Sequence, residues 1–311
     1  MKKRVLLLAV VPLILVGCTQ PASNSKVRIS VKNCGNTVNM EMVPQRVVLQ
    51  NPASVETLAQ LGVLDHVVAK AGYFPEDYFA RDTNETLSKV PTLSDKLDET
   101  GHVEVSYEDV MAEEPDLIIG YSDEVNTDTV TDIPIVTEPT FCGEVRNASF
   151  EDINAHIDLY ASLFNEREAA VNMKSDIAHY ISRLNEQAGA GKSVAVVYPG
   201  LNGAPMYAYG KDSMAHPIVE SVGLTNVFDD QQDRVAEITP EQLVEKNPDV
   251  IVVLHSDEPG AKEAVKALPG ADAITAVNKN EIFDMHLAFA EAPTPLAVQG
   301  AKQLEGFLEG K

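Results

Sequence analysis

The sequence predicts an α/β fold built as two lobes of similar construction. One segment occurs twice, short apolar runs alternate with amphipathic helical stretches, and the length suffices for two cores. The two copies are Ser106 to Ile119 (SYEDVMAEEPDLII) and Thr239 to Val252 (TPEQLVEKNPDVIV), which align without a gap at an offset of 133 residues. We therefore expect a mostly parallel sheet in each lobe, covered by helices on both faces.

Each copy of the repeat has the pattern of a capped helix, a tight turn and a buried strand. Ser106 and Thr239 can accept free N–H groups as N-caps, and Pro240 suits the first helical position. Glu108 and Glu241 follow in the first turn, where the helix dipole favours anions. The Pro-Asp pair and the aliphatic run behind it predict the turn and the strand.

The amino terminus predicts export. Lys2 to Arg4 precede the apolar run Val5 to Val16, which is shorter than the about 20 residues of a membrane-spanning helix. Residues 1–17 therefore have the pattern of a signal peptide. The end of this segment resembles a bacterial lipobox, which implies that Cys18 is lipidated and holds the protein on the extracytoplasmic face of the cell membrane. The alternative is a plain signal peptide followed by an incidental cysteine.

Two further cysteines, Cys34 and Cys142, remain in the exported part. An exported chain lies where thiols can pair, so we expect one disulfide between them. It would close a loop of roughly a hundred residues, which chain entropy values at about 4 to 5 kcal/mol. Two separate thiols are the alternative, and neither cysteine has the spacing of a metal site.

The chain is strongly acidic, with a formal net charge of −23. Removal of the three basic leader residues makes the rest about −26, which excludes nucleic acid as a partner. Such acidity could attract cationic ligands or serve solubility. The acids are spread over the chain, which favours solubility.

The first lobe is expected over residues 27–148, after a lipidated polar tether at 18–26. Val27 to Met42 alternates around Asn33-Cys34-Gly35-Asn36 like a β-hairpin. Buried strands are expected at 46–50, 67–70, 117–120 and 133–136, and helices at 54–61 and 107–113.

Residues 149–191 are expected to be helical and to connect the lobes. Ser149 to Leu163 and Asn165 to Gln187 each open with a capping signal, Ser149 with Asp152 and Asn165 with Glu168. The second stretch predicts a helix over about 166–188, roughly 33 Å long. The second lobe, 192–311, would start with a strand at 193–197 and end with a helix at 295–308.

The sequence resembles the bacterial solute-binding lipoproteins that deliver ferric siderophores, haem or cobalamin to ABC importers. The resemblance rests on the Cys-Gly hairpin, both Pro-Asp repeats, and three further segments. These are Pro44 to Val48 (PQRVV), Ala59 to Val68 (AQLGVLDHVV) and Ile218 to Val227 (IVESVGLTNV). It implies two Rossmann-like lobes joined by one long rigid helix, the class III periplasmic binding protein architecture. It also implies a monomer that works with a permease and its ATPase, with no intrinsic cofactor.

The resemblance further implies a role for Glu108 and Glu241. In vitamin B12-binding relatives an acid at this position of each lobe contacts arginines of the permease. Each acid alone is equally explained by stabilisation of its own helix.

Ligand-binding residues are expected at the carboxyl ends of the strands, where open α/β sheets form crevices. Aromatic side chains with a few polar groups suit a bulky, partly flat ligand such as a catecholate chelate or a porphyrin. The candidates are Gln50, Asn51, Tyr73, Phe74 and Tyr121 in the first lobe, and Tyr198, Arg234, His255, His286 and Phe289 in the second.

Alternative ligands depend on single residues. His255 or His286 could ligate a haem iron with a tyrosine opposite, and Arg234 or Arg146 could pair with an anionic ferric chelate. The three-His-plus-carboxylate pattern of the metal-ion relatives is absent from the sequence. Gly189 to Ser193 resembles a phosphate-binding loop, but a helix precedes it and a strand follows, so we interpret it as a turn.

The function predicted from the sequence is capture of a ferric siderophore between two lobes, without catalysis. The sequence contains neither a GxSxG nucleophile elbow nor an HExxH zinc helix. A haem- or cobalamin-binding receptor is the main alternative. A divalent metal-binding protein, a non-transport surface lipoprotein and an enzyme of the same fold are less supported.

Overall fold

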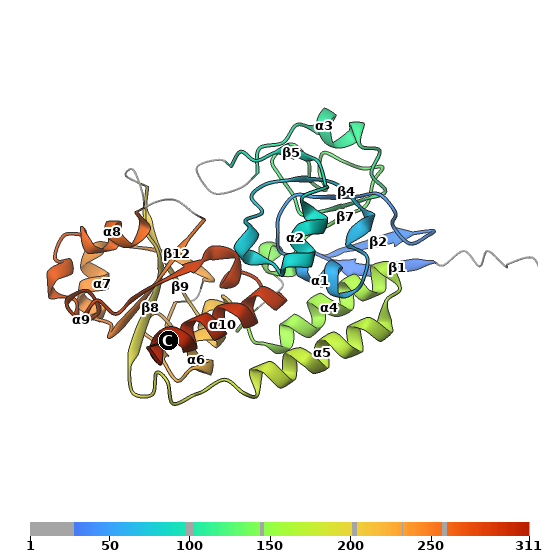
Figure 1. Cartoon of the computed structure of the whole chain (residues 1–311). Coiled ribbons are helices and arrows are strands. Elements are labelled where there is room, and N and C mark those ends of the chain that lie inside the picture. The colour runs from blue at the N-terminus through green and yellow to red at the C-terminus, as the bar shows by residue number, and fades with distance from the viewer. Residues whose placement is uncertain are drawn as a thin grey trace, which may run out of the picture.

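The computed structural model describes residues 28–97, 103–143, 146–200, 204–231, 233–256 and 260–310. The predicted signal peptide, Cys18 and the tether at 18–26 lie outside the described residues. The chain forms a hairpin and two larger sheets, with helices between and around them (Figure 1). Among the helices of the described residues, none has the length and apolar character needed to cross a membrane.

The predicted hairpin is confirmed. Strands β1 (Ile29–Asn33) and β2 (Asn36–Met40) pair in antiparallel fashion with Asn33 opposite Asn36. The two loop residues, Cys34 and Gly35, have φ values of 51° and 75°. Both are positive, as a two-residue loop that follows the twist of its strands requires.

The first sheet is entirely parallel, with the strand order β5-β4-β3-β6-β7. In chain order, β3, β4 and β5 lie successively toward one edge of the sheet. The chain then crosses to the other side of β3, where β6 pairs with it and β7 continues toward the opposite edge. This is the strand order of Rossmann-like folds, which bind ligands where the direction reverses. The strands are β3 (Val47–Leu49), β4 (Val67–Ala71), β5 (Thr92–Ser94), β6 (Leu117–Ile119) and β7 (Ile135–Val136). The helices are α1 (Val55–Gln60), η1 (Leu64–His66), η2 (Glu76–Tyr78), α2 (Arg81–Leu87), α3 (Tyr107–Ala112) and η3 (Pro139–Cys142).

The second sheet is mixed, with the order β11-β9-β8-β12-β13 and a short β10 beside β8. Its β8, β10, β12 and β13 are parallel neighbours, whereas β9 is antiparallel to both β8 and β11. The strands are β8 (Ser193–Tyr198), β9 (Met206–Tyr209), β10 (Thr225–Asn226), β11 (Val235–Ile238), β12 (Val250–His255) and β13 (Ile282–His286). The helices are α6 (Ala215–Ser221), α7 (Pro240–Lys246), α8 (Ala261–Lys266), η4 (Ala271–Ala273), α9 (Thr275–Lys279), η5 (Leu287–Phe289) and α10 (Pro295–Leu308).

The repeated segments occupy equivalent places in the two sheets. The first forms α3 and β6, and the second forms α7 and β12; β6 pairs with β3 and β12 with β8. The Ser106 hydroxyl accepts a hydrogen bond from the Asp109 N–H, and Thr239 forms a reciprocal capping box with Gln242. Both predicted caps are therefore confirmed.

The aspartate of each Pro-Asp pair fastens the start of the neighbouring strand. Asp116 accepts hydrogen bonds from the N–H groups of Gln45 and Arg46, at 2.8 and 2.9 Å, just before β3. Asp249 accepts from the N–H and the hydroxyl of Ser193, both at 3.0 Å, at the start of β8. The two copies of the repeat thus share a geometry as well as a sequence pattern, because the equivalent aspartate orders the first strand of each sheet.

The prediction of one helix over 166–188 is wrong in its length. The connection consists of α4 (Glu151–Phe164) and α5 (Arg167–Ile181), which pack against each other, and turns at 182–192 lead into β8. Asn165 does not open the second helix, because its φ of 59° makes it the left-handed C-cap of α4. At the end of α5 the hydrogen-bonding pattern changes, because carbonyls there accept from N–H groups three residues later instead of four. The Asn185 N–H then donates to the carboxylate of Glu305 in α10.

One hydrophobic cluster joins the two sheets. It contains one face of the first sheet (Val47, Leu49, Leu117), one face of the second (Val194, Val252), and side chains of α4, α5 and α10. The opposite face of each sheet packs into a smaller cluster of its own. Figure 1 shows α10 lying between the second sheet and the α4–α5 pair. The lobes therefore share a core, which favours small relative motions.

A buried polar network fixes the segment that leaves the first sheet. Glu138 and His156 are each 1% exposed and joined by a contact of 2.8 Å between Oε2 and Nδ1. The Tyr160 hydroxyl donates to the other Glu138 oxygen at 2.6 Å, and His156 Nε2 lies 2.7 Å from the Thr57 hydroxyl. Burial disfavours the charged carboxylate, but the charge and hydrogen bond of His156 and the Tyr160 hydrogen bond outweigh it and lower the pKa of Glu138.

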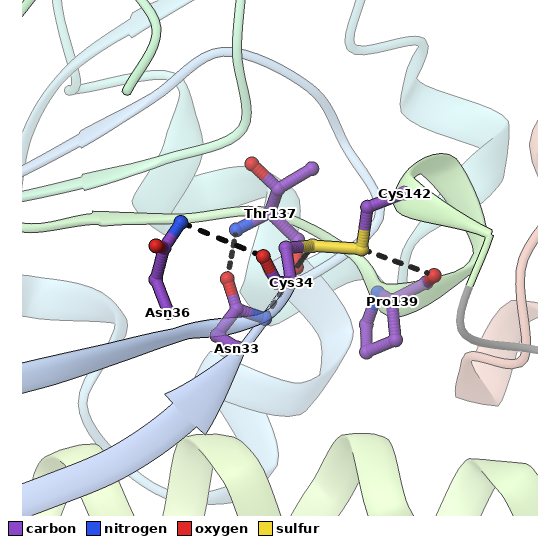
Figure 2. Close-up of a disulfide and its surroundings, with 6 residues drawn as sticks. All are labelled: Asn33, Cys34, Asn36, Thr137, Pro139 and Cys142. Atoms are coloured by element: carbon purple, nitrogen blue, oxygen red, sulfur yellow. Dashed lines mark hydrogen bonds between the residues drawn. A yellow bond between two sulfur atoms is a disulfide. The ribbon is translucent and has the colours of Figure 1, made fainter. Parts of the chain in front are cut away.

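The predicted disulfide between Cys34 and Cys142 is confirmed, with a Cα–Cα distance of 5.6 Å and a sequence separation of 108. It ties the hairpin to η3 (Figure 2). Beside it, Asn33 and Thr137 exchange two hydrogen bonds of 2.7 and 2.9 Å. The hairpin and the end of the first sheet are thus joined covalently and by paired polar groups.

Candidate functional site

A cleft with a cavity volume of about 210 Å³ lies at the carboxyl ends of strands from both sheets. Residues after β3, β4 and β6 form one wall, and residues before β11, after β12 and around η5 form the other. The lining residues are Gln50, Asn51, Pro52, Ala53, Gly72, Tyr73, Tyr78, Leu97, Val103, Tyr121, Phe141, Arg234, Ser256, Leu287, Ala288, Glu291 and Ala292. The cleft therefore opens where the strand order of the first sheet reverses.

Two glycines allow the strand ends of the first wall to approach Gln50 and Asn51 closely. Gly120, at the end of β6, has a φ of 104°, and a Cβ there would lie 2.6 Å from Asn51 Nδ2 and 2.9 Å from Gln50 Cβ. Gly72, at the end of β4, has a φ of 108°, and its Cβ would lie 3.2 Å from the Gln50 carbonyl oxygen. Glycine permits both the backbone conformation and the close approach.

Gln50 forms the floor of this wall and is 2% exposed. Its N–H extends the β3–β6 pairing by donating to the Ile119 carbonyl at 2.8 Å, and its Nε2 donates to the Val125 carbonyl at 3.2 Å. Its Oε1 is buried and has no hydrogen-bond partner among the described residues. A ligand with a hydrogen-bond donor would satisfy this oxygen, since an unpaired buried acceptor is costly.

The second wall carries an ion pair. Arg234 Nη1 lies 3.1 Å from Glu291 Oε1, and the two side chains are 28% and 24% exposed. The Arg234 guanidinium also lies 5.8 Å from the ring centroid of Phe141, which comes from the first wall. The arginine therefore contacts both walls of the cleft.

Tyr209 lies buried near this pair. Burial raises the pKa of its hydroxyl strongly, and the charge of Glu291 adds to the rise, while Arg234 opposes it. Tyr209 is therefore neutral at physiological pH and adds no charge to the wall.

The structure brings five of the ten candidate ligand-binding residues into the cleft: Gln50, Asn51, Tyr73, Tyr121 and Arg234. The other five candidates do not line it. Phe74 and Tyr198 pack against the shared core. Phe289 is fully buried, and its ring lies 5.2 Å from that of Tyr78.

The two candidate histidines are not among the residues that line the cleft. His286 Nε2 contacts Asp77 Oδ2 at 2.6 Å, and its ring lies 4.7 Å from that of Tyr78 and 4.6 Å from that of His255. Asp77 and Tyr78 belong to the first lobe, so His286 contributes to the contact between the lobes. Arg146 lies elsewhere, paired with Asp212 at 2.9 Å. The described residues contain no group of three or more His, Cys, Asp or Glu side chains placed to hold a metal ion.

Sequence reasoning missed several lining residues, among them Tyr78, Phe141, Leu287 and Glu291. Tyr78 and Phe141 lie in short 3-10 helices whose position depends on distant partners, His286 and Cys34. Phe141 could have been found, because it directly precedes a cysteine expected to form a disulfide. Glu291 had no local signal, because its role depends on an arginine 57 residues earlier.

Glu108 and Glu241 lie on the exposed first turns of α3 and α7, away from the cleft lining. Beside α3 is a second hollow of about 630 Å³. Its lining includes the acids Asp95, Glu104, Asp109, Asp123 and Glu124, and Lys96. The surface next to Glu108 is therefore predominantly acidic.

The family pattern described as periplasmic binding protein matches residues 47–287. The uncharacterized ABC transporter substrate-binding lipoprotein YvrC of Bacillus subtilis is 26% identical, over 98% of this chain and 96% of the relative. The crystal structure of an ABC-type Fe3+-hydroxamate transport system from Saccharomonospora viridis is 38% identical, with a TM-score of 0.84, over 91% of this chain and 99% of that chain. The periplasmic heme binding protein HutB of Vibrio cholerae is 20% identical, with a TM-score of 0.63, over 85% of this chain and 98% of that chain, and shares the fold. The chain therefore belongs to the periplasmic binding protein family and is a substrate-binding protein of the ABC-transporter type.

Proposed function

We propose that this protein captures a ferric siderophore in the cleft and delivers it to the permease of an ABC importer. The observation that carries the proposal is the composition of the cleft. Four aromatic side chains (Tyr73, Tyr78, Tyr121, Phe141) accompany a few polar groups at the carboxyl ends of the strands. Such a lining suits a bulky ligand with polar edges. The 38% identity to an Fe3+-hydroxamate transport protein supports the same class of ligand.

Haem is the second candidate, and the tyrosines of the cleft favour it. Tyr73 and Tyr121 line the cleft and belong to a residue type that ligates haem iron. His255 and His286 are absent from the lining, so a haem site in this cleft would use tyrosine. Cobalamin binding would require neither a tyrosine nor a histidine ligand. The thermal-shift screen described next tests for it as well.

A thermal-shift screen of the purified chain tests the ligand class. The probes are ferrichrome, ferric enterobactin, haemin and cobalamin. A ligand present at about a hundred times its dissociation constant should add close to 2.7 kcal/mol to the free energy of unfolding. A shift with a ferric siderophore supports the proposal. A shift with haemin alone, accompanied by a change in the Soret band, replaces it with haem binding, and a folded protein that responds to none of the probes contradicts it.

We also propose that Glu108 and Glu241 dock the protein on its permease. Both side chains are exposed, and each lies in the first turn of a helix of the repeated unit. Hydrogen bonds from its own N–H and from Thr239 lower the pKa of Glu241 and so favour its ionised form. The acidic hollow beside α3 extends the negative surface around Glu108. Basic side chains of a permease would complement these surfaces.

The double variant Glu108→Ala/Glu241→Ala should abolish transport in cells and leave the affinity of the purified protein for its ligand unchanged. Glu113→Ala/Glu245→Ala is the matched control, because it removes two acids near the other ends of the same helices. Normal transport by the first double variant would contradict docking through these residues.

We propose in addition that a lipid on Cys18 anchors the protein to the membrane. Cys18→Ser should therefore release the protein from membranes.

A further inference from the structure

The charges of the cleft are balanced within one wall. Of the described residues that line the cleft, only Arg234 and Glu291 are charged at neutral pH, and they are bonded to each other at 3.1 Å. The remaining lining residues are aromatic, aliphatic, amide or hydroxyl side chains and glycine. The site therefore presents an arginine whose charge is already compensated.

Glu291 competes with any anionic group that approaches Arg234. An arginine without a partner would attract a ligand carboxylate or catecholate through charge-assisted hydrogen bonds. Here the carboxylate of Glu291 already accepts from Nη1, and it repels a second anion at the same place. Phe141 covers the guanidinium from the opposite wall at 5.8 Å. An anionic ligand that approached the other N–H groups of Arg234 would still be repelled by the carboxylate of Glu291.

Among the described residues of the lining, no further side chain restores a positive charge. Tyr209 beneath the pair is neutral, and the net charge of the chain is −23. The long-range field of such a protein disfavours the approach of polyanions. A chelate without net charge avoids both penalties.

On the other wall, Gln50 adds a second requirement for the ligand, which is a hydrogen-bond donor. Its buried Oε1 is an acceptor without a protein partner among the described residues. It is satisfied by an N–H or O–H of the ligand and repels a ligand carboxylate or phenolate oxygen. Both walls therefore favour a ligand that is neutral and carries hydrogen-bond donors.

We infer that Glu291 is a specificity-determining residue, which neutralises Arg234 so that the cleft selects electroneutral ferric tris-hydroxamates over polyanionic ferric chelates. Three singly charged hydroxamates balance the charge of Fe³⁺, whereas three doubly deprotonated catecholates leave a trianion. Haemin carries two propionates and is disfavoured for the same reason. This inference rests on the proposed function, because it assigns the chemical class of the same ligand.

Calorimetric titration of the full-length chain with ferrichrome and ferric enterobactin tests the inference. Wild type should bind ferrichrome, the neutral tris-hydroxamate, at least about tenfold more tightly than ferric enterobactin, the tris-catecholate. Glu291→Gln should shift this affinity ratio about tenfold or more toward ferric enterobactin, and Arg234→Gln should shift it in the opposite direction. The shift caused by Glu291→Gln should shrink between about 0.05 and 0.5 M NaCl, because salt screens the charges.

Asp230→Asn is the matched control. Asp230 pairs with Lys246 at 3.3 Å outside the cleft lining, so this variant changes the net charge of the protein by the same amount as Glu291→Gln. It should leave the affinity ratio at the wild-type value. Circular dichroism verifies that each variant is folded.

Failure of the inference and failure of the function give different results. If wild type binds both chelates and Glu291→Gln leaves their ratio unchanged, the selectivity role of Glu291 is wrong and the siderophore receptor stands. A wild-type preference for ferric enterobactin also overturns the inference alone. If folded wild type binds neither ferric chelate, the proposed function fails, and the inference fails with it.

Discussion

Asp249 shows how one side chain of the repeat can fix the start of a strand by accepting hydrogen bonds from it. Its carboxylate accepts the N–H and the hydroxyl of Ser193, and Asp116 does the equivalent work before β3. Hydrogen bonds from the Ser193 backbone and hydroxyl lower the pKa of Asp249, although partial burial opposes them. A carboxylate with a lowered folded-state pKa stabilises the protein above its unfolded pKa of about 3.9, and this contribution disappears as pH falls through the folded value.

Asp249→Asn should therefore cost about 1 kcal/mol of unfolding free energy at pH 7, and the cost should shrink at pH 3. Urea unfolding at the two pH values measures the difference. Asp272→Asn, on the exposed surface of η4, is the control and should show no such dependence. An equal loss for Asp249→Asn at both pH values would show that the ionised form is not what orders β8.

Gly120 links the backbone to the cleft. Gly120→Ala places a methyl group against Asn51 and Gln50 at a positive φ, so it should reduce the unfolding free energy by about 1 to 3 kcal/mol and weaken ligand binding. Gly306→Ala is the opposite case, because its Cβ meets nothing within 4 Å and it lies in α10. That variant should gain up to about 1 kcal/mol. Denaturant titrations compare the two, and unchanged stability and affinity in Gly120→Ala would refute the proposed constraint.

The disulfide element joins the hairpin to η3, and Phe141 precedes Cys142 directly. Cys34→Ser/Cys142→Ser should lower the unfolding free energy by about 4 to 5 kcal/mol on the chain-entropy argument. It should also weaken ligand binding, because η3 loses its covalent attachment beside the cleft. Urea titration with and without a reductant provides the comparison, and wild type under reductant should match the double serine variant. Equal midpoints for oxidised and reduced wild type would rule out a stabilising role.

Local sequence signals were sufficient for the elements that carry their own boundaries. The helix at 295–308, the hairpin that turns at Cys-Gly and the hydroxyl caps of both repeats are all confirmed. The failures depend on distant contacts. The connecting helix ends at Ile181, and the turns that follow it bond to α10. Strands β5, β9 and β11 are held by pairing with neighbouring strands, and the local sequence gives no signal of this pairing.

The candidate site divides in the same way. Residues that directly follow a buried strand, such as Gln50, Tyr73 and Tyr121, were identified because parallel strands bring their carboxyl ends together. His255 and His286 also end strands, yet neither lines the cleft: His286 packs against Tyr78 and Asp77, and His255 packs against His286. Strand ends therefore indicate the region of the cleft, and the packing of the second lobe decides which of its side chains line it.

Considered as a unit, the protein should unfold in a single transition. The largest hydrophobic cluster contains side chains of both sheets and of α4, α5 and α10, so neither lobe can lose its core alone. Differential scanning calorimetry should give a van't Hoff enthalpy equal to the calorimetric enthalpy. Two resolved transitions would show that the lobes fold independently, and the shared cluster would then contribute little to their cooperation.

The placement of Arg234 and Glu291 on the same wall has a mechanical consequence. The two residues move together when the lobes separate, so opening the cleft breaks no salt bridge inside it. Polar contacts that do span the lobes, such as those of Asp77 with His286 and of Arg146 with Asp212, lie outside the cleft lining and resist opening there. Opening the cleft therefore leaves its charge balance unchanged, although it separates the Arg234 guanidinium from Phe141. An incoming molecule is discriminated by charge at its first encounter, before either lobe has moved.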